Sequence, residues 1–169
     1  MSADGATEVV AALRERGWTV ATAESLTAGL VAATLADVPG ASAVLRGGVV
    51  VYATELKHSL ADVPVEVLET HGAVSADTAR ALAVGAARRC GADVGIGLTG
   101  VAGPDRQEGV AVGTVHVGIC VPDRQPWSVE LALSGDRREI RERACGAALA
   151  LVTDAARASG TGAGEEWQR

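Results

Sequence analysis

Two side chains in this sequence have types and positions that suit acyl-transfer chemistry, Ser25 and Lys57. Ser25 lies between a predicted strand over residues 18–22 and a predicted helix over residues 26–36. At such a junction, backbone N–H groups without intrahelical partners can receive an anion or a developing oxyanion. The hydroxyl of Ser25 is therefore a candidate nucleophile. The plainer interpretation is that this hydroxyl only caps the helix.

Lys57 is the candidate for the base that such a serine needs. Lys and Arg together number 15, and Lys57 is the only lysine among them, while Tyr52 is the only tyrosine. Unlike arginine, a buried lysine can lose its proton and take one from a serine. Tyr52 ends a predicted strand over 49–52 and Lys57 lies in the helix predicted over 54–60, so both could lean over one sheet edge. A compositional bias, or a solvated surface lysine, would explain them equally simply.

Other candidate binding residues also follow predicted strands, where ligands collect in open α/β sheets. Thr99 ends a strand predicted over 93–99, and Gly100 begins a glycine-rich loop in which the backbone can approach a ligand closely. Arg137 begins the last predicted helix and could hold a phosphate through a bidentate contact. The alternative for Arg137 is an exposed helix face laced with ion pairs.

Helical and strand patterns alternate along the chain and predict how these residues are positioned. Ser75 is a suitable N-cap, and a short connection joins the last two strands as an antiparallel hairpin. The helices are expected over 6–17, 26–36, 54–60, 64–70, 76–90 and 136–158, and the strands over 18–22, 49–52, 93–99, 113–121 and 127–133. This order predicts a three-layer α/β/α sandwich around a mostly parallel sheet with one antiparallel strand. We expect a single domain over 1–158 and a flexible tail over 159–169.

Composition excludes several classes of protein. The 169 residues suit one domain, and no run approaches the roughly 18 apolar residues of a membrane span. A net charge of −6 argues against nucleic-acid binding, which needs clustered Lys and Arg. The start of the chain lacks an export signal, so a cytoplasmic location is expected. The scattered Cys and His residues suggest neither disulfides nor a metal site. Free sheet edges would suit a homodimer.

Several segments, taken in order, resemble the C-terminal domain family of the competence/damage-inducible protein CinA, whose stand-alone members are nicotinamide-nucleotide amidases. The matching segments are Ala23–Gly29, Tyr52–Lys57, His71–Ser75, Thr99–Pro104, Val112–Val115, Ser134–Arg137 and Ile140–Arg141. The resemblance covers about residues 7–153. It departs from the family at Leu26 and Ala28, where Cys and Gly are common, and in the loop over 105–111, where Gly-Gly and Lys are common.

The resemblance implies hydrolysis of nicotinamide mononucleotide to nicotinate mononucleotide and ammonia, in pyridine-nucleotide recycling and without a cofactor or metal. It implies that Ser25 attacks, that Lys57 takes the proton and that Tyr52 is a hydrogen-bonding partner in this transfer. Thr99 and the backbone of Thr27, Ala28 and Gly29 are implied as substrate or oxyanion contacts. Two alternatives stay open, a non-catalytic nucleotide-binding or regulatory module and an amidase of another carboxamide.

Overall fold

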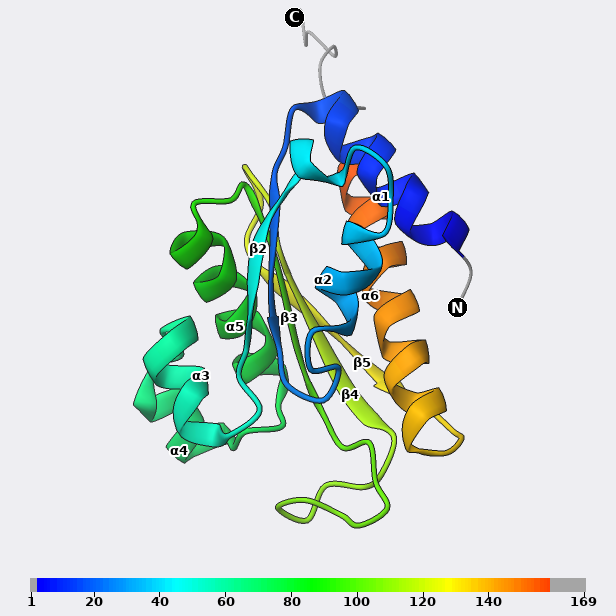
Figure 1. Ribbon diagram of the computed structural model, residues 1–169. Coiled ribbons are helices and arrows are strands. Elements are labelled where there is room, and N and C mark those ends of the chain that lie inside the picture. The colour runs from blue at the N-terminus through cyan, green and yellow to red at the C-terminus, as the bar shows by residue number, and fades with distance from the viewer. Residues whose placement is uncertain (1–2, 159–169) are drawn as a thin grey trace, which may run out of the picture.

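The alternating strands and helices form a five-stranded sheet with helices on both faces (Figure 1). The computed structural model describes residues 3–158. The strands are β1 (Val20–Glu24), β2 (Leu45–Val50), β3 (Val94–Gly100), β4 (Thr114–Cys120) and β5 (Trp127–Ala132), in the order β2-β1-β3-β4-β5. β2 and β3 pair with β1 in parallel, whereas β4 pairs with β3 and β5 in antiparallel fashion. β4 alone therefore runs against the others, which confirms the predicted sheet.

The helices divide into two layers (Figure 1). One layer contains α1 (Ala3–Arg16), α2 (Leu30–Ala36) and α6 (Arg137–Ala158), and the other contains α3 (Thr54–Ala61), α4 (Val65–His71) and α5 (Ala76–Cys90). A 3-10 turn, Ala41–Ala43, precedes β2. A separate cluster of buried apolar residues fills the space between the sheet and each layer. The predicted three-layer architecture is confirmed.

Helix α5 lies directly on the backbone of the sheet. Gly97 of β3 and Gly118 of β4 face each other across the strand pair, and both sit beneath Ala79. A methyl group at Gly97 would lie 2.3 Å from the carbonyl oxygen of Ala79, and one at Gly118 would lie 2.0 Å from it. Side chains at these two positions would therefore lift the helix from the sheet. The side chain of Ser75 caps α5 by accepting from the Thr78 N–H, as its position predicts.

Several predicted bounds differ from those observed, and the strand predicted over 18–22 is β1, which ends at Glu24, directly before Ser25. The helix predicted over 26–36 begins only at Leu30, because Ala28 (φ 50°) and Gly29 (φ 93°) are left-handed and make residues 25–29 a turn. The strand predicted over 49–52 is β2, which starts earlier, includes Gly47 and Gly48, and ends at Val50, so the prediction that Tyr52 ends a strand is wrong. A methyl group at Gly48 would lie 2.2 Å from Oγ1 of Thr22, so glycine lets the two strands approach.

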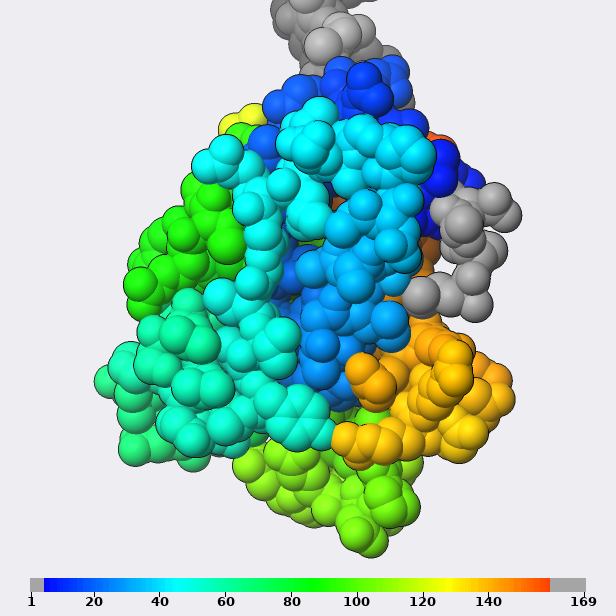
Figure 2. Space-filling view, in the orientation of Figure 1, coloured from blue at the N-terminus to red at the C-terminus, as the bar shows by residue number. Residues whose placement is uncertain are grey.

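Four segments meet at the carboxyl ends of the parallel strands. They are the turn over 25–29, the link over 51–53, the loop over 101–113 and the start of α6 (Figure 1). In Figure 2 the cyan surface that follows β2, the orange surface of α6 and the yellow-green surface of the loop adjoin at the lower part of the molecule. The predicted tail over 159–169 lies outside the described residues. Within residues 3–158, no helix combines the length and hydropathy that crossing a bilayer requires.

Candidate active site

The amine of Lys57 lies against the hydroxyl of Ser25. Nζ donates to Oγ of Ser25 at 3.1 Å, to the Val51 carbonyl oxygen at 2.9 Å and, at a long 3.5 Å, to that of Tyr52. Lys57 is 2% exposed and Ser25 is 8% exposed. The solvated-lysine interpretation is therefore wrong. So is the helix-cap interpretation of Ser25, because the N-cap of α2 is Gly29.

Burial lowers the pKa of Lys57 from its ordinary value of 10.5, and the carboxylates of Glu108 and Glu55 partly oppose this shift. An ammonium group has three N–H donors, which match the three oxygen atoms around it. A neutral amine has two N–H donors and a lone pair. If the two carbonyl oxygens accept those N–H groups, the lone pair faces the hydroxyl of Ser25. The site can therefore hold the serine next to a base.

The turn that carries Ser25 is held by the carboxylate of Glu24, which is fully buried. This carboxylate accepts from the backbone N–H groups of Gly29 (3.0 Å), Val31 (3.1 Å) and Ala32 (2.9 Å), and from the hydroxyl of Thr22 (3.0 Å). The positive end of α2 is thus already occupied by an acid of the chain itself.

This arrangement corrects the expectation that the amides opening α2 are available to a substrate. The N–H of Gly29 is bonded to Glu24, and that of Ala28 donates to the Ser25 carbonyl oxygen at 3.1 Å. The N–H groups of Leu26 and Thr27 have no partner among residues 3–158. Among the N–H groups of residues 26–29, those of Leu26 and Thr27 are therefore the two left without a partner within residues 3–158, and those of Ala28 and Gly29 are already bonded.

A cavity of about 280 Å³ opens over Ser25. Two arginines, Arg106 and Arg137, line it together with Asp105. Its wall also includes Leu26, Tyr52, Gln107 and the segment Gly100–Pro104. The cavity therefore has in its wall the hydroxyl of Ser25, which contacts the buried Lys57, and it has positive side chains elsewhere, the layout expected for a small anionic ligand.

Arg137 and Tyr52 lie together at the rim of this cavity. The guanidinium of Arg137 donates to the phenolic oxygen of Tyr52 and to the Gly103 carbonyl oxygen. The ion-paired helix face considered as an alternative is formed instead by Arg138 and Glu142, 2.8 Å apart. Tyr52 is 54% exposed and contacts Lys57 through its backbone oxygen. A part for its hydroxyl in proton transfer stays a prediction.

The remaining predicted contacts differ in their access to the cavity. Gly100 lines it, and a methyl group there would lie 2.7 Å from the Thr114 carbonyl oxygen. Thr99 is 1% exposed, and its hydroxyl donates to the Ala73 carbonyl oxygen at 2.6 Å, tying β3 to the segment before α5. Direct contact of Thr99 with substrate stays a prediction. Thr27 is fully buried in the turn.

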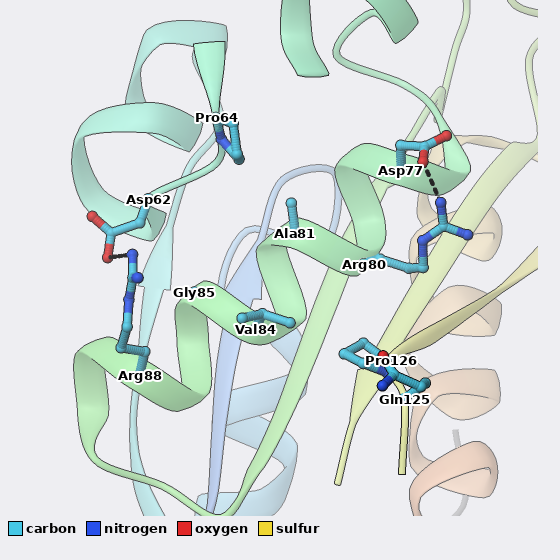
Figure 3. A pocket seen from close by; sticks show the side chains of 10 residues that line it. All are labelled: Asp62, Pro64, Asp77, Arg80, Ala81, Val84, Gly85, Arg88, Gln125 and Pro126. Atoms are coloured by element: carbon cyan, nitrogen blue, oxygen red, sulfur yellow. Dashed lines mark hydrogen bonds and ion pairs between the residues drawn. The ribbon is translucent and has the colours of Figure 1, made fainter. Parts of the chain in front are cut away.

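A larger cavity, of about 460 Å³, lies on the outer side of α5 beside Pro64 and Pro126 (Figure 3). Its charged groups already pair within the protein, Asp77 with Arg80 and Asp62 with Arg88 at 2.6 Å. It contains neither Ser25 nor Lys57. The smaller cavity is therefore the candidate active site. Across residues 3–158, His, Cys, Asp and Glu side chains form no group of three that could hold a metal ion.

Fold and site define the class of this protein: an α/β/α sandwich that buries a serine–lysine pair at the carboxyl edge of its sheet. Residues 3–156 match the family model described as the CinA C-terminal domain, and the chain belongs to this family. It is 49% identical over 144 residues to a CinA-like protein of Anaeromyxobacter, covering 85% of this chain and 35% of that protein. It is 48% identical over 149 residues to a competence-damage inducible protein of Symbiobacterium thermophilum, again 35% of that protein's length and 83% of this chain.

Solved structures of similar length share the whole fold. A CinA superfamily protein of Klebsiella pneumoniae superposes with a TM-score of 0.88 at 31% identity, covering 92% of this chain and 98% of that one. The competence/damage inducible protein CihA of Agrobacterium tumefaciens gives 0.86 at 33% identity, covering 92% and 94%. The chain thus spans about a third of the curated relatives it matches and nearly all of these solved chains.

Proposed function

We propose that this protein is an amidohydrolase that converts nicotinamide mononucleotide to nicotinate mononucleotide and ammonia. The observation that carries the proposal is the 3.1 Å contact between the buried amine of Lys57 and Oγ of Ser25. A buried lysine next to a serine at the wall of a cavity is the arrangement of a base and its nucleophile. Membership of the CinA C-terminal family supports the choice of reaction.

In the first half of the reaction, Oγ of Ser25 attacks the carboxamide carbon and Lys57 takes the hydroxyl proton. An ester bond forms to Ser25, and the C–N bond breaks as Lys57 returns the proton to the leaving amine, which departs as ammonia. In the second half, water attacks the ester carbon and gives a proton to Lys57. The ester bond then breaks, and the acid leaves as Ser25 regains its proton.

Positive side chains at the cavity support a substrate that carries a phosphate group. Arg137 retains donors beyond those it directs to Tyr52 and Gly103, and a guanidinium binds phosphate through paired N–H groups. Arg106 lines the same cavity and is the second candidate for this role. In this proposal Tyr52 steadies Arg137, while Gly100 lets the substrate approach the backbone.

Ammonia release from nicotinamide mononucleotide tests this function directly. The wild-type chain is compared with Ser25→Ala and with Ser59→Ala, a matched control on the exposed side of α3. We expect release from wild type and Ser59→Ala, and a loss of about 10⁴-fold or more in Ser25→Ala. Calorimetric binding without ammonia release would instead support a nucleotide-binding module. Ser25-dependent release from other carboxamides alone would support an amidase with another substrate.

A further inference from the structure

Arg141 of α6 holds the turn that carries Ser25 by its carbonyl groups, whereas Glu24 accepts from N–H groups. Its Nε donates to the Leu26 carbonyl oxygen at 2.8 Å, and its Nη2 donates to the Thr27 carbonyl oxygen at 3.0 Å. The side chain is half-buried. A planar guanidinium can bridge two successive carbonyl groups, which a lysine ammonium cannot do in the same fixed geometry. Arg141 therefore fixes two consecutive peptide units beside the nucleophile.

The carbonyl groups of Ser25, Leu26 and Thr27 have partners, but two N–H groups of this turn do not have one within residues 3–158. The Ser25 carbonyl oxygen accepts from the Ala28 N–H, and Arg141 bonds those of Leu26 and Thr27. In a trans peptide, the C=O and the following N–H point in opposite directions. Fixing the carbonyls of Ser25 and Leu26 therefore directs the N–H groups of Leu26 and Thr27 to the other side of the turn.

A buried hydroxyl group in the same turn also lacks a hydrogen bond among residues 3–158. Oγ1 of Thr27 is buried and lacks a hydrogen-bond partner within the described part of the chain. Buried polar atoms without partners are rare in folded proteins. Here this hydroxyl and the two N–H groups lie within two residues of Ser25, and Leu26 itself lines the cavity. An oxyanion that forms at a nucleophile is stabilised by hydrogen-bond donors nearby that have no other partner.

We propose that Arg141 is a positioning residue for the oxyanion formed when Ser25 attacks an acyl carbon. By bonding the Leu26 carbonyl it aims the N–H of Thr27 directly. By bonding the Thr27 carbonyl it fixes the N–H of Ala28, which holds the Ser25 carbonyl and so aims the N–H of Leu26. The inference rests on the proposed function only in taking Ser25 as the nucleophile. Arg141 touches no substrate in this scheme. Its effect passes through the two peptide units that it bonds and through the Ala28–Ser25 hydrogen bond, so it should act on the transition state and hardly on substrate binding.

Arg141→Met tests the role, with Arg138→Met as the matched control one turn earlier on α6, where the side chain of Arg138 is exposed and bonds Glu142. We expect kcat for ammonia release to fall about 10²-fold in Arg141→Met, with KM changed by less than about threefold. Added methylguanidine should restore part of the lost kcat in that variant. If Arg141→Met does not fold, Arg141→Lys, which places one charge at the same turn, replaces it in the comparison.

A fluorophosphonate probe separates this inference from the identity of the substrate. In that reaction Oγ of Ser25 forms a bond to phosphorus, fluoride leaves, Lys57 takes the hydroxyl proton and the phosphoryl oxygen occupies the oxyanion position. We expect phosphonylation about tenfold slower or more in Arg141→Met than in Arg138→Met. Equal phosphonylation rates and equal kcat values in the two variants would overturn the role of Arg141. Slower phosphonylation in a chain that hydrolyses no carboxamide would retain Arg141 and reject the proposed amidase.

Discussion

Nζ of Lys57 lies 3.1 Å from Oγ of Ser25, although 32 positions separate the two residues in the chain. The contact forms because β1 and β2 are parallel neighbours, so that the turn after one strand and the helix after the other begin at the same edge of the sheet. Around the pair, Val51 and Tyr52 supply carbonyl oxygens to the amine, and both side chains of the pair are buried. Each of these contacts leads to a measurable expectation.

Lys57→Arg tests whether Lys57 acts as a base or contributes only its positive charge. Arginine keeps the charge but stays protonated at neutral pH, so it cannot take the proton of Ser25. We expect kcat for ammonia release to fall about 10²–10⁴-fold. Steady-state assays on the purified variant measure this, with thermal unfolding to show that the fold is retained. A Lys57→Arg variant as active as wild type would remove Lys57 from the chemistry.

Activity should rise with pH as Lys57 loses its proton, along a limb centred below the ordinary pKa of 10.5. The carboxylate of Glu108 raises this pKa, so Glu108→Gln should lower it and move the limb to lower pH. The glutamine oxygen can still accept from the Ala73 N–H, as the carboxylate does at 3.1 Å.

Carbon-13 labelling of lysine reports the pKa of Lys57 without an activity assay, because the chain has no other lysine. Glu55→Gln should shift the resonance titration in the same direction, whereas Glu142→Gln, on the exposed pair with Arg138, is the neutral control. An unchanged or higher pKa in Glu108→Gln would contradict the effect.

Glu24→Gln should destabilise the protein. The carboxylate accepts three backbone N–H groups and the Thr22 hydroxyl, whereas an amide has a single oxygen and would turn an NH₂ group toward some of these donors. Leaving buried donors unpaired lowers the free energy of unfolding by about 2–3 kcal/mol. Urea denaturation measures the loss, with the exposed Glu15→Gln as the control. Equal stability of the two variants would contradict the role of Glu24.

His116 makes stability depend on pH. Burial lowers its pKa below 6.5, and Glu130 partly opposes this shift. Above pH 6.5 the imidazole is neutral in both states and contributes no pH dependence. As pH falls below 6.5, the unfolded chain binds the proton first, so the free energy of unfolding decreases until the folded pKa is reached. Denaturation at about pH 7.5 and about pH 5.5 should show a smaller loss in His116→Gln than in wild type; an equal loss would contradict the assignment.

Much of the fold can be predicted because its signals are local. The helix predicted over 76–90 has its observed bounds, since Ser75 marks its start and an apolar face runs along it. The sequence pattern finds only Val49 and Val50 of β2, because Gly47 and Gly48 weaken it. The reason for Gly48, the close approach of Thr22, lies in another strand.

The sequence predicts the chemistry of the candidate site but not its support. Ser25 and Lys57 stand out by type and by position after strands. Glu24 and Arg141 carry no comparable signal, since a glutamate at a strand end and an arginine on a charged helix usually face water. Only the tertiary fold brings them onto the turn, where Arg141 bonds carbonyl groups 115 and 114 positions away. The sequence signal that could have pointed to Glu24 is its position, since it is an acidic residue directly before the candidate nucleophile Ser25.

The carboxylate of Glu24, which accepts from the N–H groups at the start of α2, has a consequence for how ligand preference can change within this family. With the helix terminus neutralised from within, the positive side chains at the cavity come from the loop over 101–113 and the start of α6, and under the proposed function these side chains recognise the phosphate. Those residues are separate from the ones that hold Ser25 and Lys57. Ligand preference can therefore evolve by exchanging a surface loop while the hydrolytic apparatus stays intact.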